Sequence, residues 1–443
     1  MLKRAAILLF FVNAVSVLFG YVKHAQTQIS KSIKNGMQTK PPISAFAGVN
    51  YWYGGFACVD SINGLQRVQK ELDFLKQNGI STLRVMCSAE GDSTYPYRVY
   101  PSIQEQQGQL NHRILRGFDR FLYEVEKRNM KVVFVLCNNW EWSGGFGQYL
   151  CWSQPQIKHP PLPKTANWDW DNYCSFIGSF YSDTTATKAY WDFVSALLKH
   201  KSYINGKTYT QQSAIFAWQL ANEPRPMVKE KTADFVKWVE KSAALIRKLD
   251  TLHYISIGVE GNIGLNQDMD LFKRIHNNAN IDYATIHLWP KTWNWYSGNA
   301  SNAFKPECID NIKTYIDKHA QACAEIGKPL VIEEFGFERD ANYAFPIESK
   351  EHLISRFSPN SKTTARDSFY ALVYSEGLKH KVRGFHFWGY AGLPENVNKT
   401  KYFMLPGMAY SADPPQEEQG LYSVFTSDKT TWKVIRKYAK RMK

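Results

Sequence analysis

Short apolar runs recur along the chain, and between them apolar residues follow the spacing of a helix face. Most of the runs are apolar almost throughout, which is typical of parallel strands buried on both faces. Helical spacing is clear in Leu65–Gln77, where apolar residues stand at 65, 68, 72 and 75, and in Ala233–Leu249. Similar stripes occur in Phe118–Arg128 and Cys308–Ile326. Eight strands are predicted, at Ser44–Tyr51, Thr82–Met86, Lys131–Asn139, Ile215–Glu223, Tyr254–Gly261, Tyr283–Pro290, Pro329–Gly336 and Gly384–Gly392.

Strands and helices that alternate eight times favour an α/β fold of the (β/α)8 TIM-barrel type. A doubly wound open sheet is the alternative, but no glycine-rich phosphate loop follows the first strand. Barrels with loop insertions reach 443 residues as one domain, so we predict a single catalytic domain over residues 44–443. Long insertions follow four strand ends, on the face where barrel enzymes bind substrate. They are Trp140–Tyr190, Lys291–Lys305, Glu338–Asp367 and Leu393–Gly420.

The beginning of the chain has the pattern of a secretory signal. Two basic residues come first, Ala5–Gly20 is apolar apart from two polar residues, and cleavage is expected near Ala25. This segment is short for a membrane span, although an uncleaved anchor is the alternative. We therefore expect a signal peptide at 1–25, a flexible lead-in at 26–43, and a secreted, periplasmic or extracellular protein without a stable membrane span after cleavage.

The formal net charge is +14. A basic balance can indicate a nucleic acid or an acidic polymer as partner. Here the lysines and arginines are scattered along the chain. This pattern favours a solvated basic surface, and we expect no nucleic acid partner.

Export would permit disulfides. The seven cysteines are odd in number, so at least one is free or pairs between chains. Cys151 and Cys174 bracket an aromatic-rich stretch and are the expected pair. Cys87 and Cys137 stand at predicted strand ends and suit small buried positions. The cysteine and histidine spacing does not suggest zinc.

Two predicted strands carry a glutamate at the carboxyl end, Glu223 in Ala-Asn-Glu-Pro and Glu334 in Ile-Glu-Glu-Phe-Gly. In a parallel barrel these ends meet at one rim. Two carboxylates that face each other can cleave a glycosidic bond, one as acid/base and the other as nucleophile. We assign Glu223 as acid/base and Glu334 as nucleophile. Glu333 is the competitor, but side chains alternate along a strand, so we expect Glu333 to point away into a structural salt bridge.

Three polar residues are predicted to support the pair. Arg84 lies inside an apolar strand, where a buried cation needs a carboxylate partner, and Glu334 is the natural one. Asn222 precedes Glu223 and could hydrogen-bond a sugar hydroxyl. His287 ends the sixth strand and could orient a carboxylate or bind sugar. Each could instead be purely structural.

Tryptophans gather near the predicted strand ends. Sugar rings stack their C–H faces on indole, while the indole N–H can bind hydroxyls. We expect Trp388 to form a floor under the reacting sugar and Trp289 to take part in binding. The clustered residues are Trp52, Trp140, Trp142, Trp289, Trp293, Trp295 and Trp388.

Several motifs resemble those of glycoside hydrolase family 5, and more narrowly of its mannan endo-1,4-β-mannosidases, over roughly residues 44–440. They are Phe216–Arg225, Ala284–Pro290, Glu333–Gly336, Gln419–Phe425 and the Asn-Asn-Trp-Glu-Trp-Ser-Gly-Gly stretch at 138–145. The resemblance implies the same two glutamates, with Arg84, Asn222, His287 and Trp388 around the sugar. Many relatives have Tyr where this chain has Trp289, and Asn138 or Asn139 stands where the family has a histidine. The expected substrate-binding residues are therefore Arg84, Asn222, His287, Trp289, Trp388, Trp52 and Asn139.

We therefore expect a retaining hydrolase that cleaves internal β-1,4-mannosidic bonds of mannan, glucomannan or galactomannan. The expected partner is a β-mannan-type polysaccharide or oligosaccharide, bound by a monomer without metal or cofactor. An exo-acting β-mannosidase and a β-1,4-glucanase or cellulase are alternatives on the same fold. A non-catalytic glycan-binding protein is a remote alternative of another class.

Overall fold

The computed structural model describes residues 40–59, 62–92, 97–161, 169–296, 306–340, 361–397 and 403–442. The chain divides into two units, a larger one over Ser44–Lys443 and a smaller one over Met1–Ile43. The predicted signal peptide and nearly all of the predicted lead-in lie outside the described residues. The fold below is that of the larger unit.

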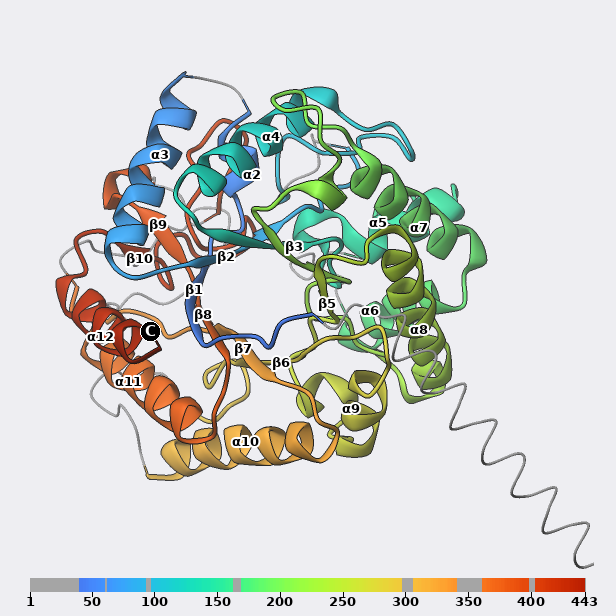
Figure 1. Cartoon of the computed structure of the whole chain (residues 1–443). Helices are drawn as coiled ribbons and strands as arrows, with labels where there is room; N and C mark the ends of the chain where they lie inside the picture. Colours follow the sequence, from blue (N-terminus) through green and yellow to red (C-terminus); the bar gives the residue numbers. More distant parts are fainter. Residues whose placement is uncertain are drawn as a thin grey trace, which may run out of the picture. The chain divides into compact units, whose positions relative to one another are not determined.

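Eight parallel strands surround a common axis, which confirms the predicted (β/α)8 barrel (Figure 1). Their order in the sheet is β5-β4-β3-β2-β1-β8-β7-β6. The two end strands are joined by single hydrogen bonds, such as the Asp282 amide to the Ile255 carbonyl at 2.9 Å. The strands are β1 (Phe46–Asn50), β2 (Thr82–Met86), β3 (Lys131–Val135), β4 (Ile215–Gln219), β5 (Tyr254–Ser256), β6 (Ala284–Leu288), β7 (Leu330–Phe335) and β8 (Gly384–Phe387).

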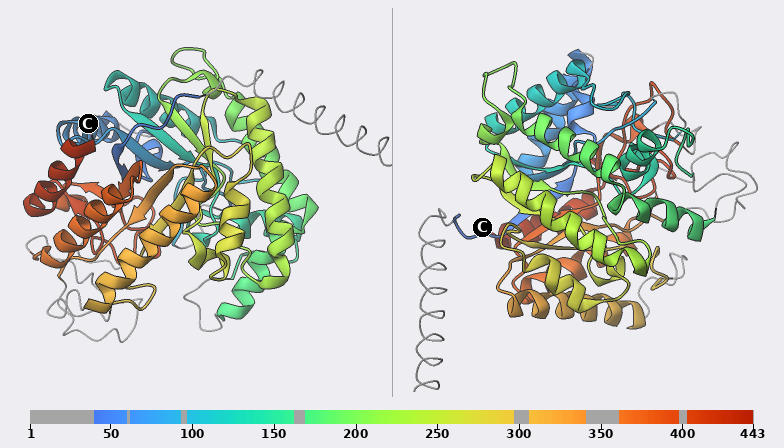
Figure 2. Two further views of the ribbon diagram at one scale, coloured as in Figure 1. Left: turned by 60° about the horizontal axis from the view of Figure 1, so that its bottom comes forward. Right: turned by 90° about the vertical axis from the view of Figure 1, so that its right-hand side faces the viewer.

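Helices cover the outside of the strands (Figure 2). The predicted apolar stripes over residues 118–128, 233–249 and 308–326 lie in helices that bury those apolar residues on one face. No helix within the described ranges is long and apolar enough to cross a membrane. The helices are α2 (Gly54–Ala57), α3 (Ile62–Gln77), α4 (His112–Lys127), α5 (Gly145–Ser153), α6 (Trp170–Gly178), α7 (Thr184–Lys199), α8 (Thr232–Leu249), α9 (Met269–His276), α10 (Pro306–Glu325), α11 (Thr364–Lys379) and α12 (Lys429–Ala439).

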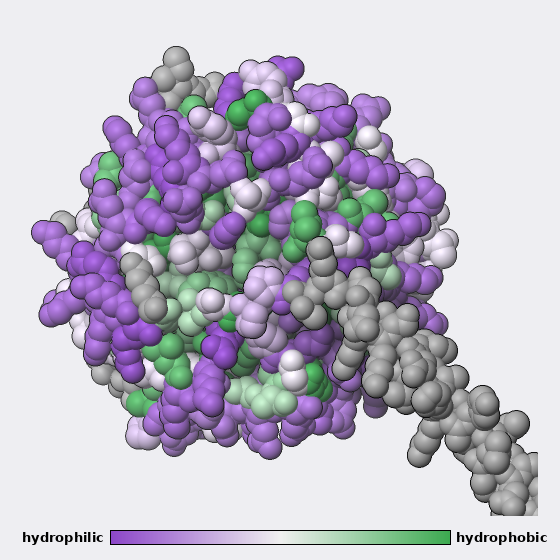
Figure 3. Space-filling model, viewed as in Figure 1, coloured by the Kyte–Doolittle hydropathy of each residue, from purple (hydrophilic) through white to green (hydrophobic). Residues whose placement is uncertain are grey.

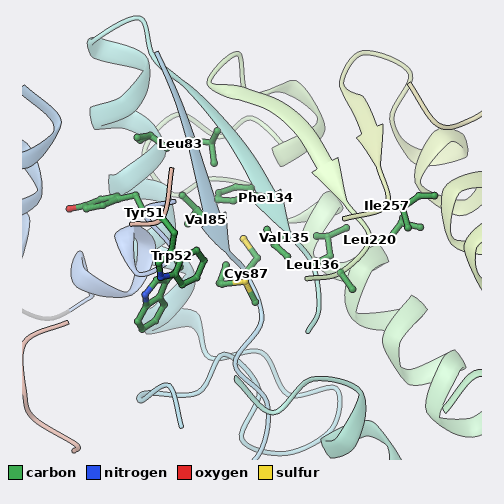
Figure 4. Packing of buried hydrophobic residues seen from close by; sticks show 14 of the residues in the cluster. Tyr51, Trp52, Leu83, Val85, Cys87, Phe134, Val135, Leu136, Leu220 and Ile257 are labelled. Carbon is green, nitrogen blue, oxygen red and sulfur yellow. The ribbon is translucent and has the colours of Figure 1, made fainter. Parts of the chain in front are cut away.

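The core lies between the strands and this helical layer. Leu83 and Val85 of β2 and Phe134 of β3 are fully buried and pack together with residues such as Tyr51 (Figure 4). Burial on both faces explains why these strands are apolar almost throughout. On the face seen in Figure 3, polar residues cover most of the surface and apolar residues appear mainly toward its middle.

The insertion after β3 contains more helix than the sequence suggests. The stretch Trp140–Tyr190 contains α5, α6 and the start of α7. The predicted eighth strand stops at Phe387, and Tyr390–Gly392 forms a separate strand, β9, that pairs with β10 (Val424–Phe425). This small second sheet ties the loop after β8 to the C-terminal segment.

The prediction of a disulfide between Cys151 and Cys174 is wrong for this structure, because all seven cysteines are free thiols. All seven are buried. Cys151 lies on α5 and Cys174 on α6, where each fills space as a small apolar side chain. Cys87 and Cys137 are buried beyond β2 and β3, as predicted.

Candidate active site

Loops that follow the strands enclose a cavity of about 680 Å³ at the carboxyl-terminal rim of the barrel. Glu223 and Glu334 both line it. A cavity of this size falls within the range of about 300–1,000 Å³ typical of small-molecule sites. The predicted glutamates thus meet in one hollow, on the face where barrel enzymes carry their chemistry.

Glu223 follows β4 in an extended segment that continues the sheet. Its amide donates to the Gly258 carbonyl at 2.9 Å, and the Asn222 amide donates to the Cys137 carbonyl at 2.8 Å. The backbone of Glu223 then turns into the left-handed region, with a φ of 49°. A side chain there is uncommon and tolerated where surrounding contacts fix it. The carboxylate is 8% exposed and faces the cavity.

Glu334 lies near the end of β7, and its carboxylate is paired with Arg84. The Arg84 guanidinium forms an ion pair with Glu334 Oε1 and donates from Nη2 to Asn222 Oδ1 at 2.8 Å. It also donates to Asn50 Oδ1 at 3.0 Å and to Gln219 Oε1 at 2.8 Å. The arginine is therefore locked by amide oxygens on β1 and around β4, in agreement with the predicted pairing of Arg84 with Glu334.

Glu333 also contacts the same arginine, although alternation predicted that it would point away. Its Oε2 is 3.9 Å from Arg84 Nε and accepts from Gln219 Nε2, while its Oε1 accepts from Tyr283 Oη at 3.2 Å. The register of β7 shifts against both β6 and β8 at this point. This irregularity breaks the two-residue alternation, so adjacent glutamates can face one cation. The predicted structural salt bridge of Glu333 is present.

His287, at the end of β6, lies between the two carboxylates. Its Nδ1 is 2.7 Å from Glu223 Oε1 and 3.4 Å from Glu334 Oε2. One oxygen of each carboxylate and this nitrogen all lie within 4.8 Å of one another. Such closeness could hold a cation, but Nδ1 and the carboxylate oxygens already have partners from the protein. Contacts of both carboxylates with one imidazole nitrogen bring Glu223 and Glu334 close together, and retaining glycosidases hold their two carboxyl groups roughly 5–5.5 Å apart.

Burial raises the pKa of both Glu223 and Glu334. His287 and Arg84 oppose this rise at Glu334, and Arg225 opposes it at Glu223. Because Arg84 pairs directly with Glu334, we assign the ionised form to Glu334 and the proton to Glu223. Burial lowers the pKa of His287 to about 4, so the imidazole is neutral at neutral pH.

Two tryptophans lie on the side of the cavity next to Glu334. Trp289 donates from Nε1 to Glu334 Oε2 at 3.1 Å. The indole of Trp388 meets that of Trp289 edge to face, with ring centroids 5.7 Å apart. Both line the cavity, as predicted. The Trp289 N–H thus supplies a hydrogen-bond donor to the Glu334 carboxylate.

The structure does not bring Trp52 and Asn139 to the cavity lining. Trp52 is buried, and its Nε1 donates to the Ala412 carbonyl at 3.0 Å. The Asn139 side chain is 1% exposed and lies 3.4 Å from Met227 Sδ. Asn222 does line the cavity, but its side chain is engaged by Arg84 and by Asn138 Oδ1 at 3.1 Å. Direct sugar contacts by these residues remain predictions.

Three site residues were missed by the sequence reasoning. Trp140 donates from Nε1 to Glu223 Oε2 at 2.5 Å. The Arg225 guanidinium lies 5.0 Å from the centre of the Trp140 ring and forms an ion pair with Glu260, and all three line the cavity. Trp140 had been grouped with other tryptophans, and Arg225 directly follows the Asn-Glu-Pro motif. Their sequence positions were visible, but their contacts depend on loop paths.

An aromatic wall extends outward from Glu223. Trp140 stacks against Tyr173 with planes 9° apart and against Trp170 with planes 29° apart. Trp170 is 43% exposed, so a broad aromatic face reaches solvent at this edge of the cavity. Such a face suits the apolar side of a sugar ring.

Comparison with known proteins gives consistent matches. The GH family 5 beta-mannosidase-like family model matches residues 30–443. Mannan endo-1,4-beta-mannosidase 8 of Oryza sativa subsp. japonica is 26% identical over 301 residues, which are 65% of this chain and 73% of that protein. A glycoside hydrolase family 5 mannosidase from Rhizomucor miehei is 31% identical, with a TM-score of 0.78 over 90% of this chain and 93% of its own. An endo-1,4-beta-mannanase from the same organism shares the fold, at 18% identity and a TM-score of 0.64 over 91% and 96% of the two chains.

Proposed function

The chain belongs to the GH family 5 beta-mannosidase-like family, and from that premise we propose that it hydrolyses β-1,4-mannosidic bonds of mannan, glucomannan or galactomannan with retention of configuration. The close pairing of Glu223 and Glu334 supports this proposal most directly. One carboxyl keeps a proton and the other is paired with a guanidinium. A retaining glycosidase needs this division of states.

In the first step Glu334 attacks the anomeric carbon while Glu223 gives its proton to the leaving oxygen. Trp289 and Arg84 orient the attacking carboxylate, and His287 and Trp140 hold the acid. In the second step Glu223 removes a proton from water, which releases the sugar from Glu334. The neutral His287 keeps both carboxylates in place without competing for the proton.

We propose attack on internal bonds, as the sequence motifs suggest. Two observations favour a second mode, the removal of mannose from chain ends. The family is described as beta-mannosidase-like. The mannosidase of Rhizomucor miehei is also more similar to this chain in sequence and structure than the endo-mannanase of the same organism. Both modes use the same two glutamates and differ in how far the groove extends. Product analysis over time on β-1,4-mannan, glucomannan and carboxymethyl-cellulose separates them.

Early release of mixed oligosaccharides from the mannans would support internal cleavage. Mannose alone would establish end-on cleavage, and action on cellulose alone would overturn the substrate. The matched variant is Glu334→Ala, which should lose at least about 10⁴-fold in kcat while the folded protein still binds mannan oligosaccharides. Activity that survives this change would refute the assigned nucleophile.

We also propose, from residues 1–25, that the chain is exported. Expression of the full sequence in a secretory host should place a mature protein in the medium, with an amino terminus near residue 26. Retention of the uncleaved chain in cells would contradict export.

A further inference from the structure

Two more buried glutamates lie beside the reacting pair. Glu333 is fully buried behind Glu334, and Glu260 is 2% exposed beside Glu223. Neither has a role in the two steps above. Each lies against an arginine that also faces one of the reacting carboxyl groups.

On the nucleophile side the shared cation is Arg84. It forms an ion pair with Glu334, while its Nε lies 3.9 Å from Glu333 Oε2. Gln219 connects the two, because its Oε1 accepts from Arg84 and its Nε2 donates to Glu333. The side chain of Glu333 thus competes with Glu334 for one positive charge.

On the acid side the shared cation is Arg225. It forms an ion pair with Glu260 and lies over the ring of Trp140, whose N–H donates to Glu223. Arg225 lowers the pKa of Glu223 against the effect of burial. An arginine held by Glu260 is less available to draw the proton off Glu223.

Two guanidinium groups cannot neutralise four buried carboxylates, and an uncompensated buried charge is costly. More than one of these carboxyl groups must therefore keep a proton. Catalysis needs one such proton on Glu223. We propose that Glu333 and Glu260 are positioning residues that share Arg84 and Arg225 with Glu334 and Glu223, and so set the alkaline limit of the proposed hydrolysis.

The surroundings of Glu333 and Glu260 support this proposal. Burial raises the pKa of Glu333 and of Glu260 to about 7 each, against the opposing effect of the neighbouring arginine. Besides Arg84 and Glu334, the groups around Glu333 are Gln219, Tyr283, the Asn50 amide and, close to Arg84, His386. Besides Arg225 and Glu223, those around Glu260 are His287, Tyr315 and, next to Gly261, His319. Burial keeps the three histidines neutral by lowering their pKa values.

The test is the pH dependence of kcat/KM on an aryl β-D-mannoside. The acid limb reports ionisation of the nucleophile, and the alkaline limb reports loss of the proton from the acid. Glu333→Gln removes the negative charge that Glu333 gains as pH rises through about 7, so the alkaline limb should move down by about one pH unit with the acid limb nearly fixed. Glu260→Gln frees Arg225 to stabilise ionised Glu223, so the alkaline limb should move down by a similar amount.

Two further variants sharpen the result. Arg225→Gln removes the shared cation and should move the alkaline limb in the opposite direction, up. Glu71→Gln is the matched control, because Glu71 is also buried and paired with an arginine, Arg67 at 2.7 Å, but on α3. It should lower stability without moving either limb. If Glu333→Gln does not fold, Tyr283→Phe removes a donor to ionised Glu333 and should move the alkaline limb down by less.

Unmoved limbs in the folded variants would overturn the proposal and leave Glu333 and Glu260 as structural residues. A higher KM for Glu260→Gln with an unmoved alkaline limb would make Glu260 a sugar ligand and also overturn it. A titration of ¹³C-labelled glutamate carboxyls by NMR needs no substrate, so it separates this proposal from the proposed function. If no β-mannoside is cleaved, shifted titration of Glu223 and Glu334 in the variants would still support the sharing of the arginines, and unchanged titration would refute it.

Discussion

At the scale of single residues, Glu223 and Glu334 are assigned different protonation states because their neighbours differ. Glu334 meets a guanidinium and an indole N–H, while Glu223 meets an indole N–H and a neutral imidazole. A direct positive charge favours the ionised carboxylate far more than a neutral donor does. The chemistry therefore depends on which partner each strand end brings.

The hydrogen bond from Trp289 to Glu334 should matter for rate. Trp289→Phe removes the donor but keeps an aromatic ring, and kcat/KM should fall roughly 10- to 100-fold, as for loss of a hydrogen bond to a charged group. Trp289→Tyr should recover part of the loss, because its hydroxyl can donate again. Kinetics on one aryl mannoside compare the three proteins, and equal losses in both variants would show that ring shape matters instead.

Glu90 gives a prediction about pH and stability. It is buried, accepts from Ser88 Oγ at 2.7 Å and from the Gly145 amide at 3.0 Å, and burial raises its pKa to about 8. The fold therefore favours the protonated form, so its contribution is complete below the unfolded pKa of about 4.3 and declines as pH rises toward 8, by at most about 1.4 kcal/mol per pH unit.

Glu90→Gln should flatten the dependence of unfolding free energy on pH between pH 5 and 8. Relative to the wild type, the variant should be more stable at pH 8 than at pH 5. Chemical denaturation at several pH values measures this, with the half-exposed Glu325→Gln as control. The same slope in wild type and Glu90→Gln would contradict the prediction.

At the scale of elements, the positions of the strands could be predicted from sequence, whereas the directions and contacts of the side chains at their ends were harder to predict. Apolar runs gave all eight strands, and a charged residue inside one of them, Arg84, pointed to its carboxylate. Alternation failed at Glu333 because the register of β7 shifts, which the local sequence does not reveal. Three residues around Glu223 lie on loops that follow three different strands: Trp140, Arg225 and Glu260. Their spacing along the chain therefore could not predict that they contact one another.

The start of α7 is fixed by one side chain. Asp183 accepts from the amides of Thr185 at 3.0 Å and Ala186 at 2.9 Å, and from Ser153 Oγ at 2.7 Å at the end of α5. These donors lower its pKa. Asp183→Ala should reduce the unfolding free energy by about 1 kcal/mol, while Asp183→Asn keeps an acceptor and should lose less.

Because the folded pKa of Asp183 is depressed, its carboxylate stabilises the protein above the unfolded pKa of about 3.9 and loses this effect as pH falls through the folded value. The difference between wild type and Asp183→Ala should therefore shrink in acid. Urea denaturation at neutral and acidic pH tests both points, and a constant difference would exclude the charge as the cause.

At the scale of the whole molecule, the thiols are distributed through the interior. Burial raises the pKa of Cys151 and of Cys323 to about 12, so neither forms a reactive thiolate at neutral pH. A thiol reagent at neutral pH should label the native protein slowly, and all seven cysteines should react after denaturation without reductant. Fewer than seven reactive groups would show that disulfides form in the protein.

The join between β5 and β6 differs from every other contact around the barrel, because the sheet order leaves these strands as its two ends. Isolated bonds bridge them, including the His287 amide to the Glu260 carbonyl and Thr285 Oγ1 to the Val259 carbonyl, both 2.9 Å. Amide hydrogens there should exchange with solvent sooner than those of β2 and β3, since fewer bonds must break together. Gly258 and His287, which both contact Glu223, lie along this join. Heat should therefore disturb Glu223, the proposed proton donor, while most of the barrel is still closed.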